Sequence, residues 1–145
     1  MNSLLRVGID VGSTTIKVVV LNKERELIYK KYARHFSEIN AVLKENLAAL
    51  ENVVKEKSFS LAMTGSAGMG IAERIGLPFV QEVIACATAV KELIPHTDTV
   101  VELGGEDAKV TYFGEAPEQR MNGVCAGGTG SFIDHMASLL STDAK

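Results

Sequence analysis

A ten-residue pattern occurs twice in this chain, at residues 9–18 and 101–110. Each copy contains, in the same order, an apolar residue, a carboxylate, an apolar residue and a glycine, and ends in a lysine followed by valine. Apolar runs on both sides of a tight, glycine-containing turn predict a β-hairpin whose tip presents polar groups. The chain is therefore predicted to be an α/β protein in which two related units each open with such a hairpin.

The polar groups of the first tip, residues 12–15, are suited to a nucleotide's phosphates and their Mg²⁺. We expect Asp10 to hold Mg²⁺ through water, because this cation needs only one or two carboxylates when phosphates are present. Lys17 would add positive charge, although an ordinary surface lysine is the alternative. N–H and hydroxyl donors to the phosphate oxygens would come from Gly12, Ser13, Thr14 and Thr15.

The second tip, residues 104–107, repeats this arrangement with more acidic groups. Glu102 occupies the place that the aspartate has in the first hairpin, and we expect it to orient an attacking water. Gly104 and Gly105 permit close approach of a ligand to the backbone. Glu106 and Asp107 would repel a phosphate unless Mg²⁺ intervenes, and Asp107 has the alternative role of capping the turn.

Two further loops contain residue types that bind ligands. Residues 64–70 resemble a phosphate-binding glycine loop, but they lack the P-loop lysine and the dinucleotide-binding spacing, so plain helix entry is the favoured interpretation. Cys125 precedes a predicted helix whose dipole would favour its thiolate, as a metal ligand or nucleophile. A structural cysteine is the alternative there, and Cys86 is predicted to be a small buried residue.

The predicted elements stop partway through the second unit. We expect residues 1–96 to be a first subdomain and residues 97–145 to be the beginning of a second, so the chain is predicted to be the front piece of a longer protein. Strands are predicted at Leu5–Val11, Thr15–Leu21, Leu27–Ala33, Phe59–Thr64, Thr99–Leu103 and Ala108–Phe113. Helices are predicted after a Ser37 cap and at Gly70–Ile75, Glu82–Leu93 and Thr129–Leu140.

Composition narrows the function classes. The chain is 46% apolar and 23% charged with a net charge of −3, which gives no electrostatic reason to bind nucleic acid or an anionic membrane. We do not expect the first residues to form a signal peptide, and no apolar run is long enough to span a bilayer. Two cysteines far apart in sequence favour a reducing cytoplasm over a disulfide-stabilised fold.

The segments GIDVGSTTIKVVVL, VELGGEDAKVTYF and MNGVCAGGTGSFIDHMA together resemble the N-terminal part of the BadF/BadG/BcrA/BcrD ATPases. This family comprises activators of 2-hydroxyacyl-CoA dehydratases and ATPase subunits of benzoyl-CoA reductases. The segment CAGGTGSFID is most similar to the branch called CoA-substrate-specific enzyme activases. The resemblance runs through the whole chain in order.

The resemblance implies the actin/hexokinase/Hsp70-like (ribonuclease H-like) ATPase fold, with ATP between two subdomains. It further implies a homodimer sharing one 4Fe–4S cluster, to which Cys125 would be one ligand and a cysteine beyond Lys145 another. ATP hydrolysis would drive a low-potential electron, taken from reduced ferredoxin or flavodoxin, into a dehydratase or reductase partner. Asp10 and Glu102 would be the catalytic carboxylates, and this fragment alone would be inactive.

Two positions depart from the family pattern. The second hairpin has Glu102 where the family usually has aspartate, and Glu106 where it commonly has glutamine; both differences bear on hydrolysis. Two other classes therefore stay open, a sugar or small-acid kinase of the same superfold and a nucleotide-binding module without turnover. The loop that contains Cys125, called the cysteine loop below, favours the activator.

Overall fold

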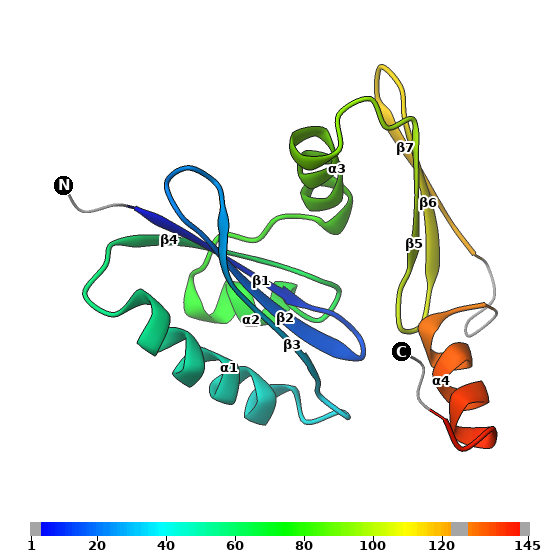
Figure 1. The fold of residues 1–145 in the computed structure, drawn as a ribbon, viewed down its shortest axis with the longest axis horizontal. Helices are drawn as coiled ribbons and strands as arrows, with labels where there is room; N and C mark the ends of the chain where they lie inside the picture. Colours follow the sequence, from blue (N-terminus) through cyan, green and yellow to red (C-terminus); the bar gives the residue numbers. More distant parts are fainter. Residues whose placement is uncertain (1–3, 123–127, 143–145) are drawn as a thin grey trace. The chain divides into compact units, whose positions relative to one another are not determined.

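The computed structural model describes residues 4–122 and 128–142. The chain divides into two compact units, Met1–Glu82 and Val83–Lys145. Figure 1 shows the elements of both units. The boundary expected between residues 96 and 97 refers to the subdomains of the complete fold and stays a prediction.

Unit 1 contains a mixed four-stranded sheet in the order β3-β2-β1-β4. The strands are β1 (Leu5–Val11), β2 (Thr15–Leu21), β3 (Leu27–Arg34) and β4 (Phe59–Thr64). β1 and β2 pair antiparallel, which confirms the first predicted hairpin, and β2 and β3 pair antiparallel as well. β4 instead joins β1 in parallel, as is possible because the chain crosses over through a helix first.

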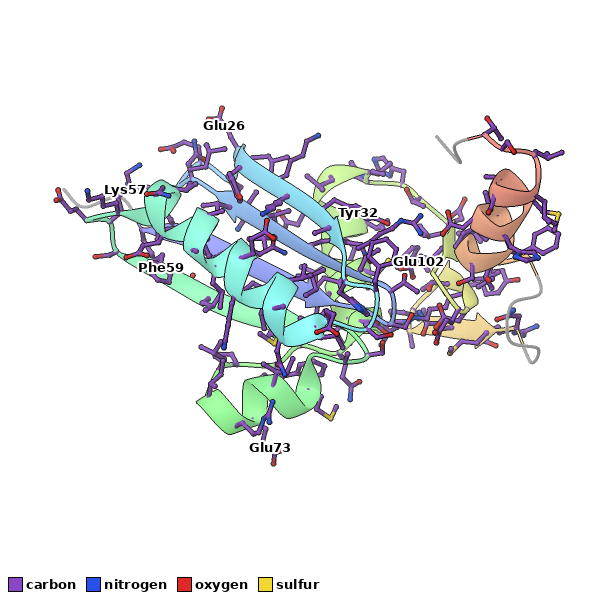
Figure 2. The ribbon with its side chains drawn as sticks, turned by 90° about the horizontal axis from the view of Figure 1, so that it is seen from below. Glu26, Tyr32, Lys57, Phe59, Glu73 and Glu102 are labelled. Atoms are coloured by element: carbon purple, nitrogen blue, oxygen red, sulfur yellow. The ribbon has the colours of Figure 1, made fainter. Side chains whose placement is uncertain are left out.

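The core of unit 1 lies between this sheet and the helix α1 (Ile39–Val54), which packs on β2 and β3 and covers one face (Figures 1 and 2). Alternate side chains of β1 and β2 point into the core, so their period of two matches the pleat. The short helix α2 (Met69–Ile75) packs beside β4 and ends at Gly76, which has the left-handed conformation expected of a terminating glycine. The buried core residues are Leu5, Val7, Ile9, Val11, Ile16, Val18, Val20, Leu43, Leu50, Val54, Met63 and Ala72.

The start of α1 differs from the prediction. Glu38, and not Ser37, is the N-cap, and it makes no side-chain capping hydrogen bond. Ser37 has φ 70°, a left-handed conformation unlike the extended backbone of a capping serine. Within α1, Leu47 is 38% exposed while Asn46 is fully buried, because the face that meets the sheet runs through positions 43, 46, 50 and 54.

Unit 2 consists of a three-stranded antiparallel sheet and two helices. Its elements are α3 (Glu82–Leu93), β5 (Thr99–Leu103), β6 (Ala108–Phe113), β7 (Pro117–Met121) and α4 (Gly130–Leu139). The predicted second hairpin is confirmed, but the sequence analysis missed β7. Its proline and three following polar residues do not alternate like a half-buried strand, and proline is tolerated there because β7 is an edge strand.

Unit 2 buries little apolar surface. Among its described residues the buried hydrophobic side chains are Ala87, Val90 and Ala137. Val101 and Leu103 of β5 are 65% and 58% exposed.

No helix in the described part of the chain is both long and apolar enough to cross a membrane.

Candidate nucleotide-phosphate site

The two hairpins have the same strand register. Asp10 lies directly opposite Lys17 in the β1–β2 pair, and Glu102 lies directly opposite Lys109 in the β5–β6 pair. Each tip therefore has one carboxylate and one lysine side by side at the end of its strands, where cross-strand neighbours interact. The sequence repeat is thus a repeat of three-dimensional structure within each unit.

The turns of the two tips also close in the same way. The N–H of Gly12 donates to the carbonyl of Thr15 at 2.9 Å, and the N–H of Gly104 donates to the carbonyl of Asp107 at 2.8 Å. These two glycine N–H groups hold the turns together. Within the first tip Ser13 is exposed, whereas Thr15 is 6% exposed and faces the protein.

One carboxylate oxygen of Asp10 is paired with a lysine, and the other is left able to bind a ligand. Its Oδ2 accepts a hydrogen bond from Lys17 Nζ at 2.8 Å, with side chains that are 28% and 44% exposed respectively. Its Oδ1 is buried and has no hydrogen-bond partner among the described residues. A carboxylate with one such oxygen at a strand end fits the predicted Mg²⁺ role, because the hydrated ion needs few protein ligands.

Lys17 contacts Asp10, and its predicted contact with phosphate stays a prediction. In the same region, the hydroxyl of Thr64 is buried without a partner among the described residues. Thr64 stands opposite Asp10 in the parallel β1–β4 pair, so both unpartnered groups lie at the same edge of the sheet. Unpartnered buried polar atoms are uncommon in folded proteins and mark places where a ligand or water completes the structure.

The glycine loop after β4 packs against the end of β1. The N–H of Ala67 donates to the carbonyl of Val11 at 2.9 Å. Gly65 has φ +99°, and a Cβ there would overlap the carbonyl oxygen of Val11 and lie 2.5 Å from Asp10 Oδ1. The loop thus needs glycine for close approach to Asp10, in addition to leading into α2.

Gly65→Ala should lower the free energy of unfolding by about 3 kcal/mol. The loss has two causes, because alanine is disfavoured in the left-handed backbone conformation and its Cβ would overlap backbone atoms. Gly76→Ala is the matched control. It also has positive φ, +67°, but its Cβ would meet no atom within 4 Å. It should cost only about 1 kcal/mol. Denaturant unfolding measures both values, and equal losses would contradict the close approach at Gly65.

In the second tip, Asp107 folds back over the turn. A Cβ on Gly104 would collide with Asp107 Oδ1, and the other carboxylate oxygen pairs with Lys109 Nζ at 3.2 Å. This geometry favours the turn-capping alternative for Asp107. Glu106 is exposed, so the two acidic residues of this tip have different surroundings.

The first turn of α4 holds the second tip. The N–H of Gly130 donates to the carbonyl of Gly104, and that of Ser131 to the carbonyl of Gly105, both at 2.8 Å. The Ser131 hydroxyl also donates to the carbonyl of Gly105. The tip and the helix that follows the cysteine loop are therefore joined by three hydrogen bonds.

Cys125 lies outside the described residues, so its predicted role as a cluster ligand stays a prediction. Within residues 4–122 and 128–142, no group of three or more histidine, cysteine, aspartate or glutamate side chains could hold a metal ion. The chain has two cysteines in all. Because a 4Fe–4S cluster takes four thiolates, this chain's own donors do not complete one.

Cys86 of α3 contacts the candidate catalytic carboxylate, which the sequence analysis did not foresee. The prediction of a buried apolar position was wrong, because Cys86 is only half-buried and its thiol interacts with Glu102, which is labelled in Figure 2. Burial and the Glu102 carboxylate raise the pKa of the Cys86 thiol, while Lys109 acts weakly in the opposite direction. The contact joins a helix to a strand, and no local sequence pattern indicates it.

Alkylation of Cys86 by iodoacetamide should require higher pH in the folded protein than in urea, because the thiolate is the reacting form. Glu102→Gln should move the pH profile downward but not fully to that of the unfolded chain, since burial is the larger cause. Glu106→Gln, an exposed carboxylate in the same tip, should leave it in place. Mass spectrometry of the Cys86 peptide measures the rate, and identical profiles for wild type and Glu102→Gln would contradict the contact.

His35 is a second residue that the sequence analysis missed. It follows β3 directly, its side chain is 3% exposed, and its imidazole contacts the carbonyl of Gly12 in the first tip. Its place at the end of the third strand was the available signal, because β3 pairs with β2 beside the tip.

Comparison with known proteins shows the family of this chain. The model of the BadF/BadG/BcrA/BcrD ATPase family matches residues 7–145. The (R)-2-hydroxyglutaryl-CoA dehydratase activating ATPase of Acidaminococcus fermentans is 30% identical over 141 residues, which are 95% of this chain and 54% of that protein. The chain thus spans about half the length of the curated relatives it matches.

Two solved structures show the same fold. Component A of the Acidaminococcus fermentans (R)-2-hydroxyglutaryl-CoA dehydratase has a TM-score of 0.82 and 29% identity, covering 98% of this chain and 56% of that one. The activator of the 2-hydroxyisocaproyl-CoA dehydratase from Clostridium difficile, with bound ADPNP, has a TM-score of 0.78 and 26% identity, covering 97% and 53%. The expected actin/hexokinase-like ATPase fold is confirmed.

Proposed function

Because this chain belongs to the BadF/BadG/BcrA/BcrD ATPase family, we propose that it is the front part of an activator that hydrolyses ATP to drive electron transfer. The electron acceptor would be a 2-hydroxyacyl-CoA dehydratase or a benzoyl-CoA reductase-type enzyme. Three curated relatives, which are 28–30% identical to this chain, are dehydratase activators. The observation that supports nucleotide binding most strongly is the matched register and turn closure of the two tips.

In this proposal the first tip binds the phosphates and the metal. Asp10 holds Mg²⁺ through water, using the carboxylate oxygen that has no protein partner. The bound metal supplies charge neutralisation on the phosphate oxygens. Ser13 and Thr14 offer hydrogen-bond donors, and Lys17 can exchange its contact with Asp10 for one with phosphate. A relative solved with bound ADPNP supports nucleotide binding by this family.

The second tip contributes the water-orienting group. The Glu102 carboxylate accepts a hydrogen bond from the attacking water, and the Cys86 thiol fixes the carboxylate by donating to it. A glutamate differs from the family's usual aspartate by one methylene, so it reaches further from β5. Glu106 stands where the family commonly has glutamine, and we propose that it also influences hydrolysis.

Coupling to electron transfer would pass through α4. The carbonyls of Gly104 and Gly105 are bound by the first turn of this helix, which directly follows the cysteine loop. A change in the second tip on hydrolysis would therefore act on the segment that contains Cys125. The cluster itself belongs to the full-length homodimer, with a second cysteine beyond Lys145, and reduced ferredoxin or flavodoxin as donor.

The chain 1–145 alone should bind Mg²⁺·ATP with a Kd of about 1 mM or weaker. Its tips supply phosphate contacts, but the contacts to adenine and ribose are expected beyond residue 145, and phosphate contacts compete with water. The full-length protein should bind at least about 100-fold more tightly. Isothermal calorimetry of both proteins tests this, and micromolar affinity of residues 1–145 would contradict the proposed division of the site.

A further inference from the structure

His35 contacts the first tip through both its backbone and its side chain. Its N–H donates to the carbonyl of Thr14 at 3.1 Å, and its Nε2 lies 3.1 Å from the carbonyl oxygen of Gly12. Its Nδ1 accepts a hydrogen bond from the N–H of Ser37 at 3.2 Å. The side chain is almost completely buried, at 3% exposure.

These partners fix which nitrogen of the imidazole holds the proton. The N–H of Ser37 can only donate, so Nδ1 must be the acceptor. The carbonyl of Gly12 can only accept, so Nε2 must be the N–H donor. The ring thus links two backbone segments: it accepts a hydrogen bond from the turn after β3 and donates one to the first tip.

The turn that presents His35 adopts a strained backbone. Phe36 and Ser37 have φ values of 45° and 70°, and the N–H of Glu38 donates to the carbonyl of His35 at 2.6 Å. Two successive left-handed residues are normally glycine or asparagine. Phe36 is 81% exposed, so its burial does not compensate for this cost. Strained backbone of this kind clusters at functional sites.

The second tip has a corresponding connection. Asn122 directly follows β7, and its Oδ1 accepts a hydrogen bond from the N–H of Ala108 at 2.9 Å. Its backbone N–H donates to the carbonyl of Ala108 at 3.0 Å. In both units, the residue after the third strand therefore holds the end of the hairpin with a polar side chain.

We propose that His35 is a positioning residue that orients the Ser13 N–H toward the nucleotide's phosphates. In a planar trans peptide, the C=O and the following N–H point in opposite directions. Holding the Gly12 carbonyl toward the buried imidazole therefore turns the Ser13 N–H toward the outside, where Ser13 is exposed. This inference rests on the proposed function, in that the first tip must bind phosphate.

Two substitutions in the full-length protein separate the two hydrogen bonds. His35→Gln keeps an N–H donor near the Nε2 position, whereas His35→Asn keeps an acceptor near Nδ1 and loses the donor to Gly12. We expect His35→Asn to raise KM for ATP about tenfold with a small change in kcat, and His35→Gln to restore KM to within about threefold of wild type. His96→Asn, an exposed histidine with φ 70°, is the matched control and should change neither constant.

Amide hydrogen exchange gives a readout that does not depend on ATP hydrolysis. His35→Asn should speed exchange in the first tip about tenfold and leave the second tip unchanged, since that tip has its own connection through Asn122. If the wild type hydrolyses no ATP, the proposed function fails, while this exchange still tests His35.

Two results would overturn the inference. One is that both His35 variants lose stability equally, with unchanged KM and no specific exchange at the first tip. The other uses the wild type, so it holds even if the variants do not fold: nitrogen chemical shifts that place the His35 proton on Nδ1. A proton on Nε2, together with a Ser13 amide signal that shifts when Mg²⁺·ATP is added, is the expected result.

Discussion

Asp10→Asn in the full-length protein should lower kcat for Mg²⁺-dependent ATP hydrolysis by at least about 100-fold. The asparagine has nearly the same shape but no negative charge, so it binds the metal's water shell far more weakly. The fold should be retained, because Asp10 lies at the end of β1 and its partner Lys17 is 44% exposed and can be solvated instead. Steady-state hydrolysis assays over a range of Mg²⁺ concentrations measure the effect.

Asp98→Asn provides the matched control for this substitution. Asp98 is exposed just before β5, outside both tips, and its replacement should change kcat less than about twofold. Unfolding measurements on both variants show whether the fold is retained. Turnover of Asp10→Asn equal to that of wild type would remove Asp10 from the mechanism.

Cys125→Ser in the full-length protein should abolish the visible absorbance and the iron of the proposed 4Fe–4S cluster, yet keep much of the ATP hydrolysis. A serine hydroxyl replaces a thiolate poorly as an iron ligand, and a cluster that lacks one of its four ligands is not retained. The phosphates and the iron would be bound at separate places, so the two activities should separate. Anaerobic iron analysis and a hydrolysis assay on the same preparation measure both.

The chain offers a matched cysteine for this experiment. Cys86→Ser should retain the iron, because the Cys86 thiol is half-buried and interacts with the Glu102 carboxylate. If Cys86→Ser lost its iron and Cys125→Ser did not, the assignment of Cys125 as the cluster ligand would be wrong. Unchanged iron content in Cys125→Ser would remove the main residue-level support for the activator.

The strands could be predicted from sequence where a local pattern determines them. β1 and β2 alternate buried and accessible positions, and the glycine turn between them sets their register, so the pairing of Asp10 with Lys17 follows directly. β7 could not be predicted from its own composition. The position of β3 in the first unit was the signal available for it.

Contacts between distant elements could not be predicted in this way. The interaction of Cys86 with Glu102 and the binding of α4 to the second tip depend on tertiary packing, which no spacing in the sequence encodes. Ser37 was misassigned as a cap because its backbone is determined by the His35 turn rather than by its side-chain chemistry. The parallel position of β4 likewise depends on how α1 packs on the sheet.

The proposed function requires one protein to combine an ATP site with an iron–sulfur cluster. The most direct test is to purify the full-length protein without oxygen, and to measure iron, acid-labile sulfide and ATP hydrolysis on the same sample. The proposed function predicts about four iron atoms and about four sulfides per dimer, together with Mg²⁺-dependent hydrolysis. A protein that hydrolyses ATP but contains no iron would contradict it and would instead support a kinase or a nucleotide-binding module of the same fold.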